Sequence, residues 1–159
     1  MSVMVGPRRR SREIALQILH QMDVSPELDP EAALARYFEH LAAESAGADD
    51  DDEAGHQPAA PPRADSTLTE ELVRGVHAHR AELDDALARI SRNWRVERMA
   101  LVDRNIIRLA LYELAHCESV PVSVAINEAV ELAKRFGTAE GAAFVNGLLD
   151  RAAGELARG

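Results

Sequence analysis

The sequence predicts an all-α fold with about six or seven helices. Aromatic residues make up only 4% of its 159 residues, whereas alanine and leucine are abundant, and this bias favours helices over strands. Apolar residues recur at spacings of three and four along most of the chain, and no segment shows the alternating pattern of a strand. With 47% apolar residues, the chain has enough hydrophobic side chains to bury a core.

The first two helices are predicted before residue 45. One covers residues 8–22, because the apolar residues from Ala15 to Met22 follow the spacing of a single helical face. The next begins at Pro30, because proline suits the first turn of a helix and Asp29 before it is a suitable N-cap.

An acidic loop is predicted over residues 45–66. This segment contains no Val, Ile, Leu, Phe or Met, and it carries six acidic residues against Arg63 alone. A segment of this composition cannot bury enough apolar surface to fold, so we expect it to be disordered. It separates N-terminal helices in residues 1–44 from a helical core in residues 67–159.

A long helix is predicted to follow the loop and to run to Ile90. It begins at Ser66 or Thr67, because Thr67 and Glu70 have the spacing of a capping box.

Three more helices are predicted after a short connecting stretch. The first covers about 100–116, and it ends before "SVP" because the residue that precedes a proline avoids helical angles. The second covers 122–136, and Gly137 suits its C-terminal end. Thr138 is a good N-cap for the last helix.

The composition also limits the compartment and the class of protein. The single cysteine, Cys117, excludes an internal disulfide and any cysteine-based zinc site within one chain. No apolar run is long enough to span a bilayer, and the arginines near the N-terminus are not followed by the apolar segment of a secretory signal. We therefore expect a soluble, cytoplasmic protein with no membrane partner.

The chemical motifs of enzymes are missing from the sequence. His77 and His79 point to different sides of a helix and cannot share an ion, so surface histidines are the better interpretation. The adjacent carboxylates Glu70–Glu71 and Asp84–Asp85 diverge in the same way. No glycine-rich phosphate loop and no nucleophile–histidine set is present. We therefore predict a protein that is not an enzyme and needs neither a cofactor nor a metal.

Four arginines lie at the start of the first predicted helix, in a protein of net charge −9. The first 12 residues contain Arg8, Arg9, Arg10 and Arg12 and no acidic residue. Like charges repel one another, and a helix N-terminus disfavours cations, so local stability opposes this placement. Arginine binds phosphate through a planar, two-pronged donor, which favours an anionic partner. A solvated, frayed terminus is the alternative.

Several long segments of the chain resemble the NusB family of bacterial transcription antitermination factors. The segments are "VDRNIIRLALYELAH" (102–116), "VPVSVAINEAVELAKRFG" (120–137), "FVNGLLD" (144–150) and "RRRSREIALQILHQ" (8–21). The likeness covers nearly everything except residues 45–66. It implies one NusB-like domain over residues 1–159, built as two packed helical bundles.

The resemblance also implies a function. Members of the family bind the boxA element of ribosomal RNA leader transcripts as a heterodimer with NusE, a small-subunit ribosomal protein. The complex joins other Nus factors and RNA polymerase, so their contact with this chain is indirect, and no catalysis is involved. The alternative is a helical protein–protein adapter or a homodimer with no role in RNA binding.

The resemblance assigns site residues position by position. The arginine cluster matches the family's basic motif, which holds backbone phosphates of single-stranded RNA. Phe144 matches an aromatic residue near the RNA, where it either stacks on a base or belongs to the core. Asp103 matches an acidic position near the NusE interface, or else it only stabilises the first turn of its own helix. The full set of RNA-binding candidates is Arg8, Arg9, Arg10, Arg12, His20 and Phe144, and the partner-binding candidate is Asp103.

The sequence departs from the family pattern in several places. His20 stands where the family usually has tyrosine. Residues 141–143 are Gly-Ala-Ala where relatives often carry polar or basic side chains, and Glu140 adds a negative charge near the expected RNA path. The acidic loop has no counterpart, and it either competes with RNA for the arginines or keeps the protein soluble.

Overall fold

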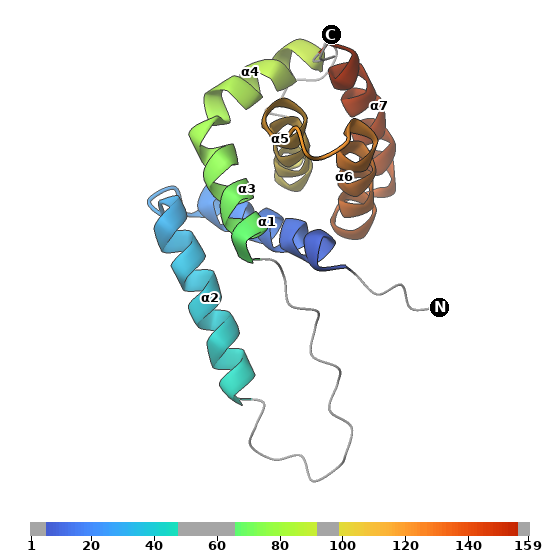
Figure 1. Cartoon of the computed structure of the whole chain (residues 1–159). Helices are drawn as coiled ribbons and strands as arrows, with labels where there is room; N and C mark the ends of the chain where they lie inside the picture. The colour runs from blue at the N-terminus through green and yellow to red at the C-terminus, as the bar shows by residue number, and fades with distance from the viewer. Residues whose placement is uncertain (1–5, 48–65, 92–98, 156–159) are drawn as a thin grey trace, which may run out of the picture. The chain divides into compact units, whose positions relative to one another are not determined.

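The computed structural model confirms the all-α prediction. It describes residues 6–47, 66–91 and 99–155, which form seven helices, and no strand occurs within these ranges (Figure 1). None of the helices in this part of the chain is long and apolar enough to cross a membrane. The chain divides into two compact units, Met1–Glu71 and Leu72–Gly159, and the boundary falls inside a helix.

The first unit contains α1 (Pro7–Val24), α2 (Pro30–Gly47) and the beginning of α3 (Ser66–Ala78). The predicted N-cap is confirmed, because the Asp29 Oδ1 atom accepts a hydrogen bond from the Ala32 backbone N–H at 2.7 Å. Helix α2 packs against α1. The Thr69 hydroxyl donates to the Ser11 carbonyl at 3.2 Å, which joins α3 to α1. The buried apolar side chains of this unit include Ile14, Ile18, Leu19, Leu34 and Leu68.

The start predicted for the acidic loop is wrong, whereas the start predicted for the next helix, at Ser66 or Thr67, is confirmed. Helix α2 continues to Gly47, and α3 already begins at Ser66. Extending a formed helix costs little per residue, which accounts for the extra residues of α2. Thr67 lies inside the first turn of α3. Residues 48–65 lie outside the described residues.

The long helix predicted to end at Ile90 is interrupted at His79. Helix α3 ends at Ala78 and α4 (Arg80–Ile90) follows, with His79 between them at φ −105° and ψ 16°. Hydrogen bonds continue across the interruption, from the His79 N–H to the Gly75 carbonyl and from the Leu83 N–H to the His79 carbonyl. The interruption of the helix is thus confined to His79. Because this residue is neither proline nor glycine, the sequence pattern did not predict the interruption.

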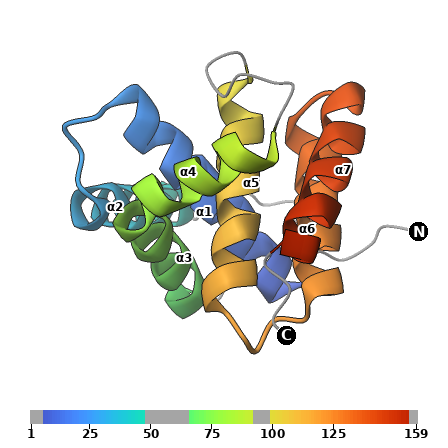
Figure 2. The same cartoon turned by 90° about the horizontal axis from the view of Figure 1, so that it is seen from above.

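The second unit is organised around α5 (Leu101–His116). This helix packs against α4, α6 (Val122–Phe136) and α7 (Ala139–Glu155), which surround it in Figures 1 and 2. Every residue of α5 from Asn105 to Leu114 is buried, as expected for a central helix. The bounds predicted for α6 are confirmed at both ends.

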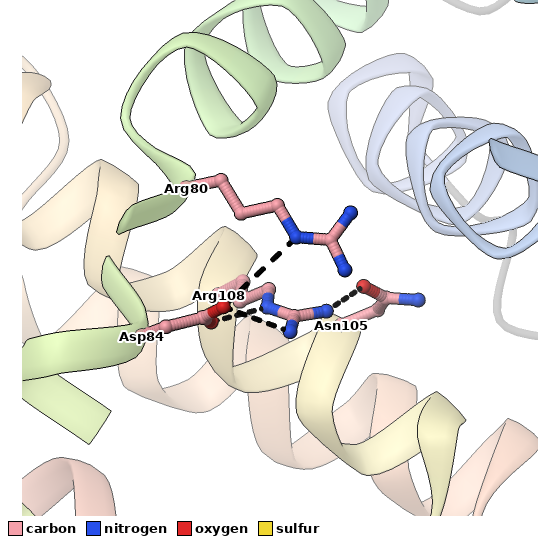
Figure 3. A network of polar contacts seen from close by, with 4 residues as sticks. All are labelled: Arg80, Asp84, Asn105 and Arg108. Atoms are coloured by element: carbon pink, nitrogen blue, oxygen red, sulfur yellow. Dashed lines mark hydrogen bonds and ion pairs between the residues drawn. The ribbon is translucent and has the colours of Figure 1, made fainter. Parts of the chain in front are cut away.

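A network of polar side chains joins α4 to α5 inside this unit (Figure 3). The buried Arg108 guanidinium donates to both carboxylate oxygens of Asp84, at 2.7 and 3.2 Å, and to the Asn105 amide oxygen at 3.0 Å. Arg80 approaches the same carboxylate at 3.9 Å. A two-pronged arginine–carboxylate pair fixes both position and orientation, so this pair holds the two helices in register.

Candidate nucleic-acid interface

The arginine cluster occupies the first turns of α1, as the sequence predicted. Helix α1 begins at Pro7, after Gly6 in an extended conformation, and among the described residues no side chain caps its first turn. The first turn contains no acidic residue. The start of α1 thus combines arginine side chains with the positive end of the helix dipole, an arrangement that favours an anion.

The four arginines differ in their exposure. Arg8 is exposed, Arg9 and Arg10 are half-buried, and Arg12 is only 5% exposed. Arg10 donates to the carboxylate of the buried Glu13 at 3.1 Å. The burial of Arg12 argues against the expectation that it reaches a phosphate, because a phosphate needs access to the guanidinium. Three arginines, Arg8, Arg9 and Arg10, therefore remain as candidates for contact with a nucleic-acid backbone.

A groove of about 540 Å³ lies between α1 and α2, and Arg10 is one of the α1 residues that line it. From α2 it receives Arg36, Tyr37 and His40, which the sequence analysis did not single out. Basic groups beside an aromatic ring are typical of surfaces that bind single-stranded nucleic acid. The signal was present in the sequence, because residues 36, 37 and 40 lie on one face of a helix. His20 is exposed on α1 and does not line this groove.

The other two candidates, Asp103 and Phe144, lie in the second unit. Both line a pocket of about 160 Å³ where the start of α5 meets the start of α7, together with Glu140 and Gly141. Phe144 is half-buried, so its ring lines the pocket and is not enclosed in the core. Glu140 is exposed beside it, which places a negative charge at the pocket.

The Asp103 carboxylate is packed closely against two glycines. A Cβ atom at Gly137 would lie 2.9 Å from its Oδ1 atom, and one at Gly141 would lie 3.1 Å from the same atom. The backbone of Gly137 has a φ of −104°, so close approach, and not a left-handed conformation, is what requires glycine there. The close approach of the Asp103 carboxylate thus leaves little room for a side chain at position 141.

Asp103 is also electrostatically unusual. Its Oδ1 atom is buried and accepts no hydrogen bond from any described residue. Burial raises the pKa of the Asp103 carboxyl above its ordinary value, because a charged group loses hydration there. Next to it, the Gly141 backbone N–H donates to the Thr138 hydroxyl at 2.9 Å, which confirms Thr138 as the N-cap of α7.

The comparison with known protein families identifies the chain. The model of the NusB family matches residues 9–154. The chain belongs to the NusB family. The NusB protein of Symbiobacterium thermophilum, named a transcription antitermination protein, is 45% identical over 142 residues, which are 89% of this chain and 86% of that protein. The NusB protein of Myxococcus xanthus, which carries the same name, is 42% identical over 94% of this chain and 96% of its own length.

The solved structures agree with the sequence comparison. The structure of T. maritima NusB superimposes with a TM-score of 0.71, at 33% identity, over 94% of this chain and 92% of that chain. This agreement confirms the NusB fold that the sequence motifs predicted. The chain is therefore a transcription antitermination factor of the NusB family, which is not a family of enzymes.

Proposed function

We propose that this NusB family member binds the boxA element of ribosomal RNA leader transcripts together with NusE, without catalysis, in the cytoplasm. Other Nus factors and RNA polymerase join this complex indirectly. The observation that carries the proposal is the start of α1, where Arg8, Arg9 and Arg10 surround the positive end of a helix with no acidic residue in its first turn.

The physical basis of binding is the attraction between guanidinium groups and phosphates. Each phosphate contact with a single strand lowers the slope of log K against log salt by about 0.7. Three arginines therefore contribute a slope of about −2, so a fourfold rise in salt weakens their share of binding by roughly 16-fold. These contacts position the strand and do not read its sequence.

Sequence preference requires groups that contact bases. Phe144 offers a half-buried ring at an open pocket, which suits stacking on an unpaired base. The exposed imidazole of His20 offers a second, smaller stacking plane. Asp103 belongs to the NusE contact in this proposal, and its packing against glycines fixes the start of α5 beside α7.

The proposal is tested by fluorescence anisotropy with a labelled boxA-like RNA and a scrambled RNA of the same length. Each RNA is titrated with this protein, with NusE, and with both proteins together. Tight binding that requires both proteins and prefers the boxA sequence is expected. Equal affinity for the scrambled RNA would refute the boxA assignment, and binding unaffected by NusE would refute the heterodimer.

A protein–protein adapter is the second candidate, and one observation favours it. Val122 of α6, which is 43% exposed, lines a groove between α6 and α7 together with Ile126 and Val130, one and two turns further along the helix. A contiguous apolar stripe on the surface is typical of protein contacts. If the protein ignores boxA RNA both with and without NusE, the adapter becomes the better account.

A further inference from the structure

Two histidines and a glutamate come together on the surface of the second unit. The residues are His79, between α3 and α4, Glu82, in the first turn of α4, and His116, at the end of α5. The sequence analysis excluded a metal site formed by His77 and His79, and that geometric argument stands. It did not pair His79 with His116, because the two are far apart in the sequence.

The contacts within this His79–Glu82–His116 cluster are short. One carboxylate oxygen of Glu82 lies 3.0 Å from the His79 Nδ1 atom, and the other lies 3.3 Å from the His116 Nε2 atom. The two imidazole rings are stacked, with centroids 4.1 Å apart. One nitrogen or oxygen atom from each of the three side chains lies within 4.8 Å of the other two.

We propose that His79, Glu82 and His116 form a binding site for a divalent transition-metal ion, with Zn²⁺ as the primary candidate. In tetrahedral coordination with bonds of about 2.1 Å, neighbouring ligand atoms lie roughly 3.4 Å apart. The two nitrogen–oxygen distances are close to this value, although each involves a different oxygen of Glu82. Because the two rings are stacked, the imidazoles must turn out of the stack until their ring nitrogens point toward a common ion. Water completes the coordination.

The nature of the ligands selects the class of ion. Two imidazoles and one carboxylate suit Zn²⁺ and its neighbours Co²⁺, Ni²⁺ and Cu²⁺, whereas Mg²⁺ and Ca²⁺ prefer sites made entirely of oxygen.

The surrounding residues hold the imidazoles in place. The ring of Tyr112, one turn before His116 on α5, lies 5.9 Å from the His79 ring and 5.3 Å from the His116 ring, measured between centroids. Tyr112 in turn packs where a side chain on Gly75 would overlap it. Packing of this kind reduces the entropy lost when the histidines bind an ion. A bound ion would tie the start of α4 to the end of α5.

The site is tested by titrating the full-length protein with Zn²⁺ in a calorimeter. Excess Mg²⁺ is present to compete for binding by carboxylates alone. At micromolar protein concentration, we expect the original protein to bind one Zn²⁺ ion per chain. The affinity for Zn²⁺ is expected to fall at least tenfold in His79→Ala and in His116→Ala. The matched control is His77→Ala, which removes an exposed histidine at the end of α3 and is expected to bind Zn²⁺ as the original protein does.

Two further measurements keep the test decisive. Co²⁺ gives intense visible absorption when it is tetrahedral, so these bands are expected in the original protein and in the His77→Ala variant but not in His116→Ala. Glu82→Gln keeps the shape of an exposed side chain, so a loss of Zn²⁺ affinity with an unchanged circular dichroism spectrum excludes misfolding. The absence of Zn²⁺ binding in the original protein, or Zn²⁺ binding by His79→Ala and His116→Ala that is as tight as in the original protein, would overturn the proposal.

Discussion

Replacing Asp84 by alanine is expected to destabilise the second unit strongly. The Arg108 side chain, which is 4% exposed, makes two charge-assisted hydrogen bonds to the Asp84 carboxylate. Removal of Asp84 takes away a carboxylate that accepts two hydrogen bonds from this buried guanidinium, and breaking a fully buried pair in this way costs about 3–5 kcal/mol. The Asp84 side chain is 35% exposed, so water partly compensates, and we expect a loss of about 2–3 kcal/mol.

The comparison with Arg108→Met makes this prediction specific. Methionine fills a similar volume and removes the buried charge altogether, so the main penalty is the loss of the hydrogen bond to the Asn105 amide oxygen, about 1–2 kcal/mol. The free energy of unfolding, measured by urea titration, is therefore expected to fall more for Asp84→Ala than for Arg108→Met. The adjacent, exposed Asp85 provides the control, and Asp85→Ala is expected to change stability by less than about 0.5 kcal/mol.

This reasoning would be refuted if Asp84→Ala destabilised the protein no more than Asp85→Ala did. A larger loss for Arg108→Met than for Asp84→Ala would also contradict it, because the packing of the arginine stem, and not its charge, would then dominate.

Three further predictions concern other parts of the chain. Burial raises the pKa of Asp103 above its ordinary value of 3.8, so the folded state favours the protonated carboxyl. The stability that this group contributes is therefore present below pH 3.8 and is lost as pH rises through the folded-state pKa. Asp103→Asn is expected to raise the free energy of unfolding at neutral pH, but not near pH 3, in urea titrations. Gly75→Ala would force a methyl group into the Tyr112 ring and is expected to lower the free energy of unfolding by about 1–3 kcal/mol, whereas an unchanged melting temperature would show that the ring moves aside easily. Replacement of Asp49–Asp52 by asparagine is expected to strengthen RNA binding at low salt if this run competes for the arginines, and equal affinity would leave it a solubilising role.

Most of the helices follow from local signals in the sequence. Helix α6 was predicted to its exact ends because Pro121 precedes it and Gly137 follows it. The N-caps Asp29 and Thr138 were found for the same reason, since a capping side chain acts within three residues of its own position. The interruption at His79 was missed because its cause is not a proline or a glycine.

The site was only partly predictable, because side-chain exposure depends on residues distant in the sequence. The pattern identified the arginines at the start of α1, but it did not show that Arg12 is buried while Arg8 is exposed. The sequence also treated Asp84 only as half of a diverging carboxylate pair, whereas its partner, Arg108, is on another helix. His79 and His116 were missed as a pair for the same reason.

The most direct test of the RNA-binding proposal is the salt dependence of boxA binding when three arginines are replaced together. The variant Arg8→Gln/Arg9→Gln/Arg10→Gln is compared, in complex with NusE, with a control that removes the same charge from the second unit. The control, Arg89→Gln/Lys134→Gln/Arg135→Gln, changes exposed positions only. Both complexes are titrated with labelled RNA at several salt concentrations, and circular dichroism verifies that both variants fold.

We predict that the α1 variant binds boxA RNA more weakly and that its slope of log K against log salt is smaller in magnitude by about 2. The control is expected to keep both the affinity and the slope of the original protein. An α1 variant with undiminished affinity and an unchanged slope would contradict the account, because the guanidinium groups at the start of α1 would then not hold the RNA.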